Sequence, residues 1–510
     1  MSIDLGLDRL ERLVSHLPSY TRPTIHIAGT NGKGSVSALL TSILLSSRPP
    51  FRVGRYNSPH LITILDCITI DNVPASHSFY DEIRREVEEA DQKHGTHLSS
   101  FELLTMTALL AFERSGVDIV ILEVGMGGRL DATNIVPTSC ILASVLTAVD
   151  LDHQAFLGNT ITEIAKEKAG ISREGKPFIL GRQAHPEVDE VVKGVLEKTG
   201  GLLVPSVSVE KVPDEDSVFS LLGPSQSIPG GQLVSALLPS FSSSTPLRAS
   251  LSLQGAHQRD NLATALTVID TLLQNSALPF KSRITLESIE EGVSSVSWPG
   301  RLSFHKISIK ADGSNDIDKT LVLADGAHNP ASAETLGAYI ESLLESTLKS
   351  LPSSNQSPKP LPITFVLALS HSPPKTPLQT LGPLFRPVQS SAATSILNIH
   401  PAVAVLSFTP PEGMPWVKSV PASAMRGVVS SLLPSLTEDD IWVPSSPEHA
   451  AEGGGLSQDL EEALRWAAKR HSVLGGYWDD GEQVSGLVVL AGSLYLVADF
   501  YRLIEGGILG

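Results

Sequence analysis

The sequence predicts an α/β protein with mainly parallel sheets, divided into two domains. Apolar strand-like runs alternate with amphipathic helix-like runs along the chain, which is typical of doubly wound sheets. A glycine-rich segment, 29–35, joins the first such strand to a helix. The length of 510 residues exceeds what one hydrophobic core usually organises, so we expect two domains.

The periodicity of apolar residues predicts the individual elements. The expected strands are 117–124, 140–146, 178–181, 321–325, 363–369 and 403–408. The expected helices are 101–114, 160–171, 257–274, 330–349 and 460–469. The apolar run 487–500 is too short to span a bilayer and predicts a buried strand followed by a helix. Ligands of such sheets bind at the carboxyl ends of the strands.

Several segments interrupt this alternation. Segments 205–246 and 350–362 are rich in Ser, Pro and Gly, and we expect mobile surface insertions there. Segments 376–393 and 444–455 are expected to be loop-rich. The Pro-Gly turn within 298–301 predicts a boundary between a domain 1–297, which carries the glycine-rich loop, and a smaller α/β domain 298–510.

Composition narrows the classes of function. The net charge of −17 argues against a general nucleic-acid binder, because phosphate affinity needs clustered Lys and Arg. Cys67 and Cys140 both lie in apolar settings, which is typical of reduced thiols in a reducing compartment. We find neither a secretory signal nor a membrane span, and we expect a cytoplasmic protein, with mitochondria as the alternative.

The glycine-rich loop predicts a phosphate site. Ile25 and Ile27 belong to the strand before it, and apolar residues at helical spacing follow it. Its glycines allow backbone N–H groups to converge at a helix N-terminus, where Lys33 adds a charge and Ser35 is placed for Mg²⁺. The loop departs from the standard pattern at Ile27 and at Gly34. A tight strand-to-helix turn is the alternative interpretation.

Polar residues near the ends of strands are candidates for a metal site. Glu123 closes an apolar strand and suits Mg²⁺ coordination, with a salt bridge to Arg129 as the alternative. Asp152 and His153 follow the next strand, where a solvated turn is the alternative. Ser58 could offer a hydroxyl in a Ser-Pro-His turn, although an ordinary turn is the favoured interpretation of this motif alone.

Helical spacing selects Lys168 as a second candidate. A capping box starts this helix at Thr160, and Ile161, Ile164 and Ala165 then share one face with Lys168. Desolvation lowers the pKa of a buried lysine, and a neutral amine can react with CO₂ to give a carbamate, an oxygen ligand for Mg²⁺. A lysine that extends its amine to solvent is the alternative.

The second half of the chain adds two polar groups. His257 and Asn261 are four residues apart on one helix and can face one ligand. Asn329 is a good N-cap before Pro330, which explains it structurally. Capping explains Asp325 and His328 less well, and they lie at the end of a strand, where α/β sites form.

Taken together, these residues resemble the Mur-ligase-like family of folate ligases, the folylpolyglutamate synthases and dihydrofolate synthases. The matching pieces, in family order, are 4–7, 29–35, 58–61, 101–102, 123–134, 152–153, 166–171, 255–261, 298–301 and 325–330. Segments 412–416 and 492–496 make the resemblance nearest to fungal-type dihydrofolate synthases. Polyglutamate synthases usually carry an Arg-Glu-Arg-like run where this chain has Leu65-Asp66-Cys67-Ile68, which favours dihydrofolate synthase.

The resemblance implies a P-loop domain that binds ATP and pterin, followed by a Rossmann-like C-terminal domain. It implies ATP binding by Gly29, Thr30, Asn31, Gly32, Lys33, Gly34, Ser35, Asn261, Arg301 and Asp325. It implies Mg²⁺ binding by Ser58, Glu123, His153 and a carbamylated Lys168. It implies a pterin pocket formed by Asp4, Leu5, Gly6, Leu7, Phe101 and Glu102. Lys33, Lys168 and His328 would serve catalysis.

The implied reaction joins L-glutamate to 7,8-dihydropteroate through an acyl phosphate, with ATP and Mg²⁺ and without nucleic acid or membrane, in a monomer. A folylpolyglutamate synthase, or an enzyme with both activities, is the nearest alternative. A non-catalytic nucleotide or folate sensor is a more distant one, because Lys33, Glu123, His153 and Lys168 are all present.

Overall fold

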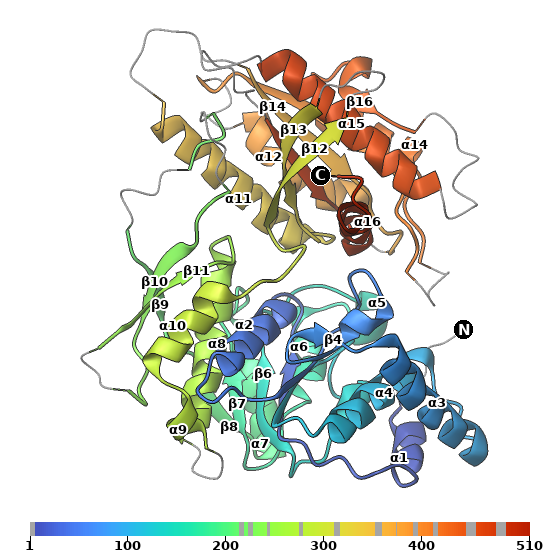
Figure 1. Ribbon diagram of the computed structural model, residues 1–510, viewed down its shortest axis with the longest axis vertical. Coiled ribbons are helices and arrows are strands. Elements are labelled where there is room, and N and C mark those ends of the chain that lie inside the picture. The colour runs from blue at the N-terminus through green and yellow to red at the C-terminus, as the bar shows by residue number, and fades with distance from the viewer. Residues whose placement is uncertain are drawn as a thin grey trace. The chain divides into compact units, whose positions relative to one another are not determined.

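The chain forms two compact units in the computed structural model (Figure 1). The structure describes residues 6–213, 219–222, 228–241, 245–274, 279–310, 317–351, 360–373, 375–390, 396–411, 417–444, 455–475 and 486–509. The first unit comprises Met1–Pro213 and Gly231–Trp298, and the second comprises Asp214–Gly230 and Pro299–Gly510. Each unit has a mainly parallel sheet and its own core, so the predicted α/β class is confirmed.

A large, mostly parallel sheet organises the first unit. Among the described residues it has eight strands in the order β4-β3-β2-β5-β1-β6-β7-β8, and every neighbouring pair from β2 to β8 is parallel. The strands are β1 (Thr24–Ala28), β2 (Val53–Tyr56), β3 (Ile68–Ile70), β4 (Val73–Pro74), β5 (Ile119–Glu123), β6 (Ile141–Leu146), β7 (Pro177–Leu180) and β8 (Leu202–Pro205). A separate antiparallel sheet consists of β9 (Val209–Lys211), β10 (Gln232–Ala236) and β11 (Leu247–Leu251).

Helices cover both faces of the large sheet. They are α1 (Asp8–Val14), α2 (Lys33–Leu45), α3 (His77–His94), α4 (Ser100–Ser115), α5 (Gln154–Leu157), α6 (Ile161–Ala169), α7 (Glu187–Thr199), α8 (His257–Gln274), α9 (Phe280–Arg283) and α10 (Leu286–Ser295). Ile25 and Ile27 of β1 pack in one core with α2, α8 and α10. Ala28 packs on the opposite face with α6 and α7. This alternation leaves β1 buried on both faces and brings its carboxyl end to the glycine-rich loop.

The second unit contains a six-stranded sheet among its described residues, in the order β12-β13-β17-β14-β15-β16. Its strands are β12 (Ser303–Lys310), β13 (Ile317–Ala324), β14 (Leu361–Leu367), β15 (Ile399–Val405), β16 (Ile441–Trp442) and β17 (Leu487–Ala491). Its helices are α11 (Pro330–Lys349), α12 (Pro377–Ser390), α14 (Ala422–Leu432), α15 (Gly455–Gly475) and α16 (Leu494–Glu505). β12 is antiparallel to β13, and the other pairs are parallel. The strand and helix predicted for 487–500 are confirmed as β17 and α16.

Local capping signals fixed several helix ends. Asn329 caps α11 by accepting a hydrogen bond from the Ser332 backbone N–H, with Pro330 in the first turn. Thr160 and Glu163 form the predicted capping box of α6. The bounds predicted for α8 and α11 agree with the structure.

The prediction of a loop-rich segment at 376–393 was wrong for most of its length. Residues Pro377–Ser390 form helix α12, with Pro383 and Pro387 inside it. Leu381, Leu384, Phe385 and Val388 lie three or four residues apart and are buried in the second core. Burial of this apolar face outweighs the local cost of proline in a helix.

The expectation of an irregular insertion at 205–246 was also wrong for the described part. β9 and β10 lie within it, and Val234 and Ala236 are buried in the first core. Leu221 is buried in the second core, and its backbone N–H donates to Thr347 Oγ1 at 3.1 Å. Residues 352–359 and 445–454 of the other two segments lie outside the described residues.

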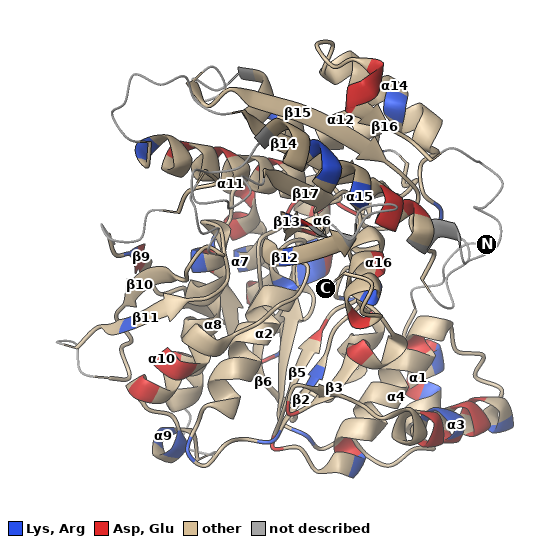
Figure 2. Cartoon of the chain, turned by 45° about the horizontal axis from the view of Figure 1, so that its top comes forward, with Lys and Arg blue, Asp and Glu red and all other residues tan. Residues whose placement is uncertain are grey.

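The described helices include none that is long and apolar enough to cross a membrane. Cys67 and Cys140 are buried free thiols, as predicted. Figure 2 shows basic residues interleaved with acidic ones along the ribbon of α3, where Arg84 pairs with Glu88 four residues later. Such interleaving is typical of a solvated helix surface.

Candidate active site at the carboxyl end of the central strand

The loop after β1 is hydrogen-bonded to the segment that follows the neighbouring strand, β6. The backbone N–H groups of Thr30 and Asn31 both donate to the Ala148 carbonyl, at 2.8 and 3.1 Å. Thr30 Oγ1 donates to the Asp150 carbonyl at 3.0 Å. Gly32 has a φ of 93°, and a Cβ at this position would collide with the Asn261 side chain. The loop therefore needs glycine at this position, which is the N-cap of α2.

Lys33 lies over this loop beside one carboxylate. Its Nζ is 3.1 Å from the Gly29 carbonyl oxygen and 3.3 Å from that of Thr30. Glu123 Oε1 is 3.7 Å from the same Nζ. Glu123 is the last residue of β5, which pairs with β1, so the order of the strands brings the two charges together. A lysine over a glycine-rich loop, beside a carboxylate, has the charge and position that could serve a phosphate group.

Buried oxygen atoms surround Glu123. Asn57 Nδ2 donates to Glu123 Oε2 at 2.5 Å. Asn57 Oδ1 and Ser58 Oγ are buried and have no hydrogen-bond partner in the part of the chain that the structure describes. Arg129 pairs with Glu167 at 3.0 Å, so the alternative of an Arg129–Glu123 salt bridge was wrong. Carboxylate, amide and hydroxyl oxygens are hard ligands of the kind that Mg²⁺ prefers.

Lys168 points inward from α6, as its helical position predicted. It is 3% exposed, and its Nζ donates to the Gly29 carbonyl at 2.9 Å. Glu163 and Lys166 of the same helix are exposed. Burial, and to a smaller extent the charge of Lys33, lower the pKa of Lys168 to about 7. The carboxylates of Asp152 and Asp131 act in the opposite direction on this pKa.

This pKa predicts a pH dependence of stability. Between about pH 7 and the usual lysine pKa of about 10.4, the unfolded chain binds more protons at Lys168 than the folded chain. The free energy of unfolding should therefore rise with pH across this window, by at most about 1.4 kcal/mol per pH unit from this group. Urea unfolding in CO₂-free buffer measures the slope, which Lys168→Met should reduce. Equal slopes in both proteins would contradict the shifted pKa.

The acidic groups alone do not make a metal site. Within the described ranges, no cluster of three or more His, Cys, Asp or Glu side chains could hold an ion. The residues fit Mg²⁺ if the buried hydroxyl of Ser58 joins Glu123, which Asn57 holds by a hydrogen bond, and if a carbamate on Lys168 supplies a further anionic oxygen. The predicted ligand set therefore depends on the modification of Lys168.

His153 and Phe101 are two further predicted site residues. His153 is at the start of α5, about half exposed, with its Nε2 3.8 Å from Asp152 Oδ2. The Phe101 ring packs against Gly125, where a Cβ would collide with it. Phe101 thus lies beside the loop that follows Glu123, in keeping with a wall of a substrate pocket.

The remaining predicted pocket residues have structural contacts. Glu102 accepts hydrogen bonds from Arg9 and completes the capping box of α4 with Ser99. Leu7 directly precedes α1 and packs, partly buried, against the core that contains residues of α4. Asp4 and Leu5 lie outside the described residues, whereas Gly6 is the first residue that the structure describes. The contacts of Glu102 give a complete structural reason for its burial.

Gln258 is a site residue that sequence reasoning missed. It is fully buried at the start of α8, and its Nε2 donates to Ser35 Oγ at 3.2 Å. Its Oε1 accepts a hydrogen bond from Asn261 Nδ2 at 2.9 Å. Gln258 and Asn261 are three residues apart and share the face that meets the loop. The same spacing rule that selected Asn261 could have identified Gln258.

The second unit has a polar cluster of its own at the end of β13. Asp325 is buried and accepts hydrogen bonds from the backbone N–H groups of Leu302 and Ala327, both at 2.8 Å. Burial raises the pKa of Asp325, and the positive charge of Arg301 lowers it. His328 is exposed, and its Nδ1 donates to the Gly326 carbonyl at 2.8 Å. Since a carbonyl only accepts, this contact places a proton on Nδ1.

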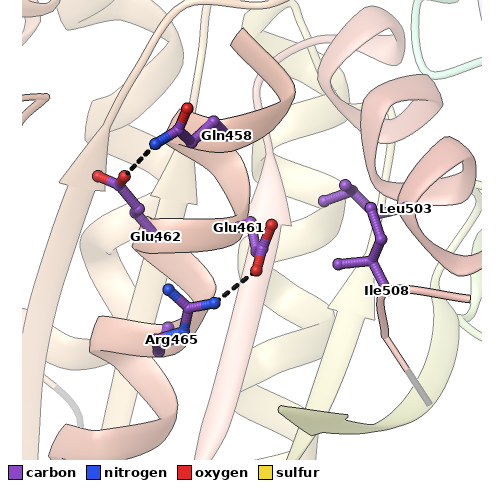
Figure 3. A pocket seen from close by; sticks show the side chains of 6 residues that line it. All are labelled: Gln458, Glu461, Glu462, Arg465, Leu503 and Ile508. Atoms are coloured by element: carbon purple, nitrogen blue, oxygen red, sulfur yellow. Dashed lines mark hydrogen bonds and ion pairs between the residues drawn. The ribbon is translucent and has the colours of Figure 1, made fainter. Parts of the chain in front are cut away.

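A pocket of about 350 Å³ in the second unit is separate from these residues (Figure 3). It is lined by Gln458, Glu461, Glu462, Arg465, Leu503 and Ile508. Arg465 donates to Glu461 at 2.5 Å, and Gln458 donates to Glu462 at 3.0 Å. The polar groups of this pocket bond to one another along α15, and none of them is a predicted site residue.

Comparisons with known proteins agree with the resemblance. Residues 306–503 match the family described as "Dihydrofolate synthetase, C-terminal domain". The dihydrofolate synthetase of Saccharomyces cerevisiae is 31% identical over 99% of this chain and 98% of that protein. The dihydrofolate synthase/folylpolyglutamate synthase of Bacillus subtilis is 31% identical over 69% of this chain and 77% of that protein. The structure of Escherichia coli FolC in complex with DHPP and ADP is similar with a TM-score of 0.65 and 25% identity, over 99% of this chain and 95% of that one.

Proposed function

This chain belongs to the family of dihydrofolate synthases and folylpolyglutamate synthases, and on that premise we propose that it joins L-glutamate to 7,8-dihydropteroate with ATP. The observation that carries the proposal is the convergence of Lys33 and Lys168 on the Gly29 carbonyl, beside Glu123. Two lysines and a carboxylate at a P-loop suit transfer of a phosphoryl group.

The proposed reaction has two steps. The carboxylate of dihydropteroate attacks the γ-phosphorus of ATP, which releases ADP and forms an acyl phosphate. The amine of glutamate then attacks the acyl carbon, loses a proton and expels phosphate, which leaves the amide of dihydrofolate. Lys33 and the N–H groups at the start of α2 stabilise charge on the transferring phosphoryl group.

A Mg²⁺ ion bound here would neutralise phosphate charge and orient the γ-phosphoryl group. Ser58, Glu123, His153 and a carbamylated Lys168 are its proposed ligands, and Asn57 orients Glu123. Phe101, with segment 4–7, is the proposed wall of the pterin pocket. We assign Asn261, Arg301 and Asp325 to the nucleotide, and we assign His328 to the acyl phosphate or the incoming glutamate. A cytoplasmic monomer remains our prediction.

Folylpolyglutamate synthesis is the second candidate. The name of the Bacillus subtilis relative combines both activities. The Saccharomyces cerevisiae relative, named only a dihydrofolate synthetase, matches along nearly its whole length. This match favours dihydrofolate synthesis. The run Leu65-Asp66-Cys67-Ile68, in place of an Arg-Glu-Arg-like run, favours the same activity.

A substrate assay separates the two candidates. Purified protein with MgATP is expected to release ADP only when dihydropteroate and L-glutamate are both present, because an acyl phosphate needs the acid and its consumption needs the amine. Coupled ADP detection with mass analysis of the product measures this. Extension of tetrahydrofolate without any reaction of dihydropteroate would favour the second candidate and defeat the first.

A further inference from the structure

Arg55 is a buried cation that the proposed reaction has not yet used. It lies on β2 and is 7% exposed. Val53, two residues earlier, packs in the core formed with α2, whereas Tyr56 packs in the core that contains α4. The alternation of a strand therefore places Arg55 on the α2 face of the sheet, the face that carries the start of the P-loop helix.

The guanidinium of Arg55 has no hydrogen-bond acceptor among the described residues. Its Nε is buried and unpaired. Buried polar groups in native proteins are nearly always hydrogen-bonded, and a buried charge without acceptors is costly. An acceptor supplied by a ligand would explain why the fold keeps this group.

The surroundings of Arg55 indicate where that ligand lies. The guanidinium carbon is 5.0 Å from the centre of the Trp298 ring. Trp298 in turn packs against Gly34, where a Cβ would be 2.6 Å from the indole. Glu123 is near enough to raise the pKa of Arg55, which burial lowers to about 10. Arg55 thus stays charged at neutral pH and belongs to the neighbourhood of Gly34 and Glu123.

A second arginine of the same unit shows that contact with a ring does not by itself leave a guanidinium unpaired. Arg283 lies 3.6 Å from the centre of the Phe51 ring. Its Nε donates to the Pro49 carbonyl at 2.9 Å, and its Nη2 is 3.5 Å from Asp118 Oδ2. The N–H groups of Arg283 therefore have acceptors within the chain, in contrast to those of Arg55.

We propose that Arg55 binds an oxyanion at the P-loop, as a second cation beside Lys33, with Trp298 holding its guanidinium plane. This inference rests on the proposed function. The oxyanion is either the γ-phosphate of the nucleotide or the carboxylate of the acid substrate, since both offer the paired oxygens that a guanidinium fork binds. Arg55 thereby contacts the reacting group, whereas the backbone of the loop binds the rest of the nucleotide.

Binding measurements on Arg55→Met and Arg55→Lys test this inference. With Mg²⁺ present, Arg55→Met is expected to weaken binding of AMPPNP about tenfold while ADP stays within about twofold, because a charged hydrogen-bond donor to the γ-phosphate is lost. Weaker binding of dihydropteroate with unchanged AMPPNP would identify the carboxylate as the oxyanion. Arg55→Lys keeps the charge and should lie between the two proteins. Titration calorimetry provides all three affinities.

Thermal unfolding without ligand separates binding from a structural role. Arg55→Met should unfold at the same or a higher temperature, because it removes an unpaired buried charge. Arg283→Met is the matched control, and it should lower the unfolding temperature with unchanged affinities. Unchanged affinities of Arg55→Met for both AMPPNP and dihydropteroate would overturn the inference, and a lower unfolding temperature with them would assign Arg55 a structural role. A wild-type protein that binds AMPPNP but makes no dihydrofolate would defeat the proposed function. The AMPPNP affinities of the Arg55 variants would still test whether Arg55 binds the γ-phosphate.

Discussion

Replacement of Lys33 by alanine is expected to lower the rate of ADP formation by about 10²-fold or more and to leave the fold intact. Lys33 Nζ contacts two neutral carbonyl groups and lies 3.7 Å from Glu123, so little of the packing depends on it. Its charge matters when negative charge moves onto the transferring phosphoryl oxygens. The measurement is kcat for ADP release with all three substrates saturating, together with the thermal unfolding temperature.

Lys193→Ala is a suitable control for this variant. Lys193 lies on α7 of the same unit, is about half exposed, and pairs with the exposed Glu190. Surface pairs of this kind contribute little, so both activity and stability should stay near those of the wild type. Near-normal turnover of Lys33→Ala would refute the assignment of Lys33 to phosphoryl transfer.

Lys168→Ala is expected to lose activity to a similar degree, about 10²-fold or more, and to recover part of it when a short carboxylic acid is added. A protonated Lys168 would repel Mg²⁺, whereas a carbamate supplies the hard oxygen that the ion prefers. Its burial and its lowered pKa favour the neutral amine that reacts with CO₂. The acid would provide a carboxylate in the space that the side chain leaves.

Two measurements distinguish a carbamate from a purely structural lysine. ¹³CO₂ NMR of the Mg²⁺-bound enzyme should show a carbamate carbon that is missing in Lys168→Ala, and crystallographic density at Nζ should show the added atoms. Lys166→Ala, an exposed lysine two residues earlier on α6, should keep both the signal and the activity. An unmodified ammonium at Lys168 in the active enzyme would contradict the proposal.

Much of the candidate site could be predicted because its signals are local in sequence. The glycines of the loop after β1 and the periodicity of α6 identify Lys33 and Lys168 without knowledge of any contact between them. The order of parallel strands then explains why both meet at Gly29, since residues after neighbouring strands share one edge of the sheet. Asp325 was likewise found from its position after a strand.

Other site features depended on partners that are distant in sequence. Glu102, predicted in a pterin pocket, contacts Arg9, 93 residues away, as well as its own helix cap. Gln258 contacts the glycine-rich loop through a hydrogen bond to Ser35, which is 223 residues away in the sequence. No local pattern marks such a pair, because either side chain alone is compatible with an exposed helix.

The sequence by itself determined the α/β class, the P-loop, the ends of α8 and α11, and the inward face of α6, because periodicity and helix caps act over a few residues. Only the tertiary structure decided that a proline-rich segment forms α12 and that part of 205–246 forms β9 and β10. It also decided that Arg55 is buried beside Trp298. In each case the deciding free energy comes from burial against elements far along the chain, which outweighs the local preference of the residues.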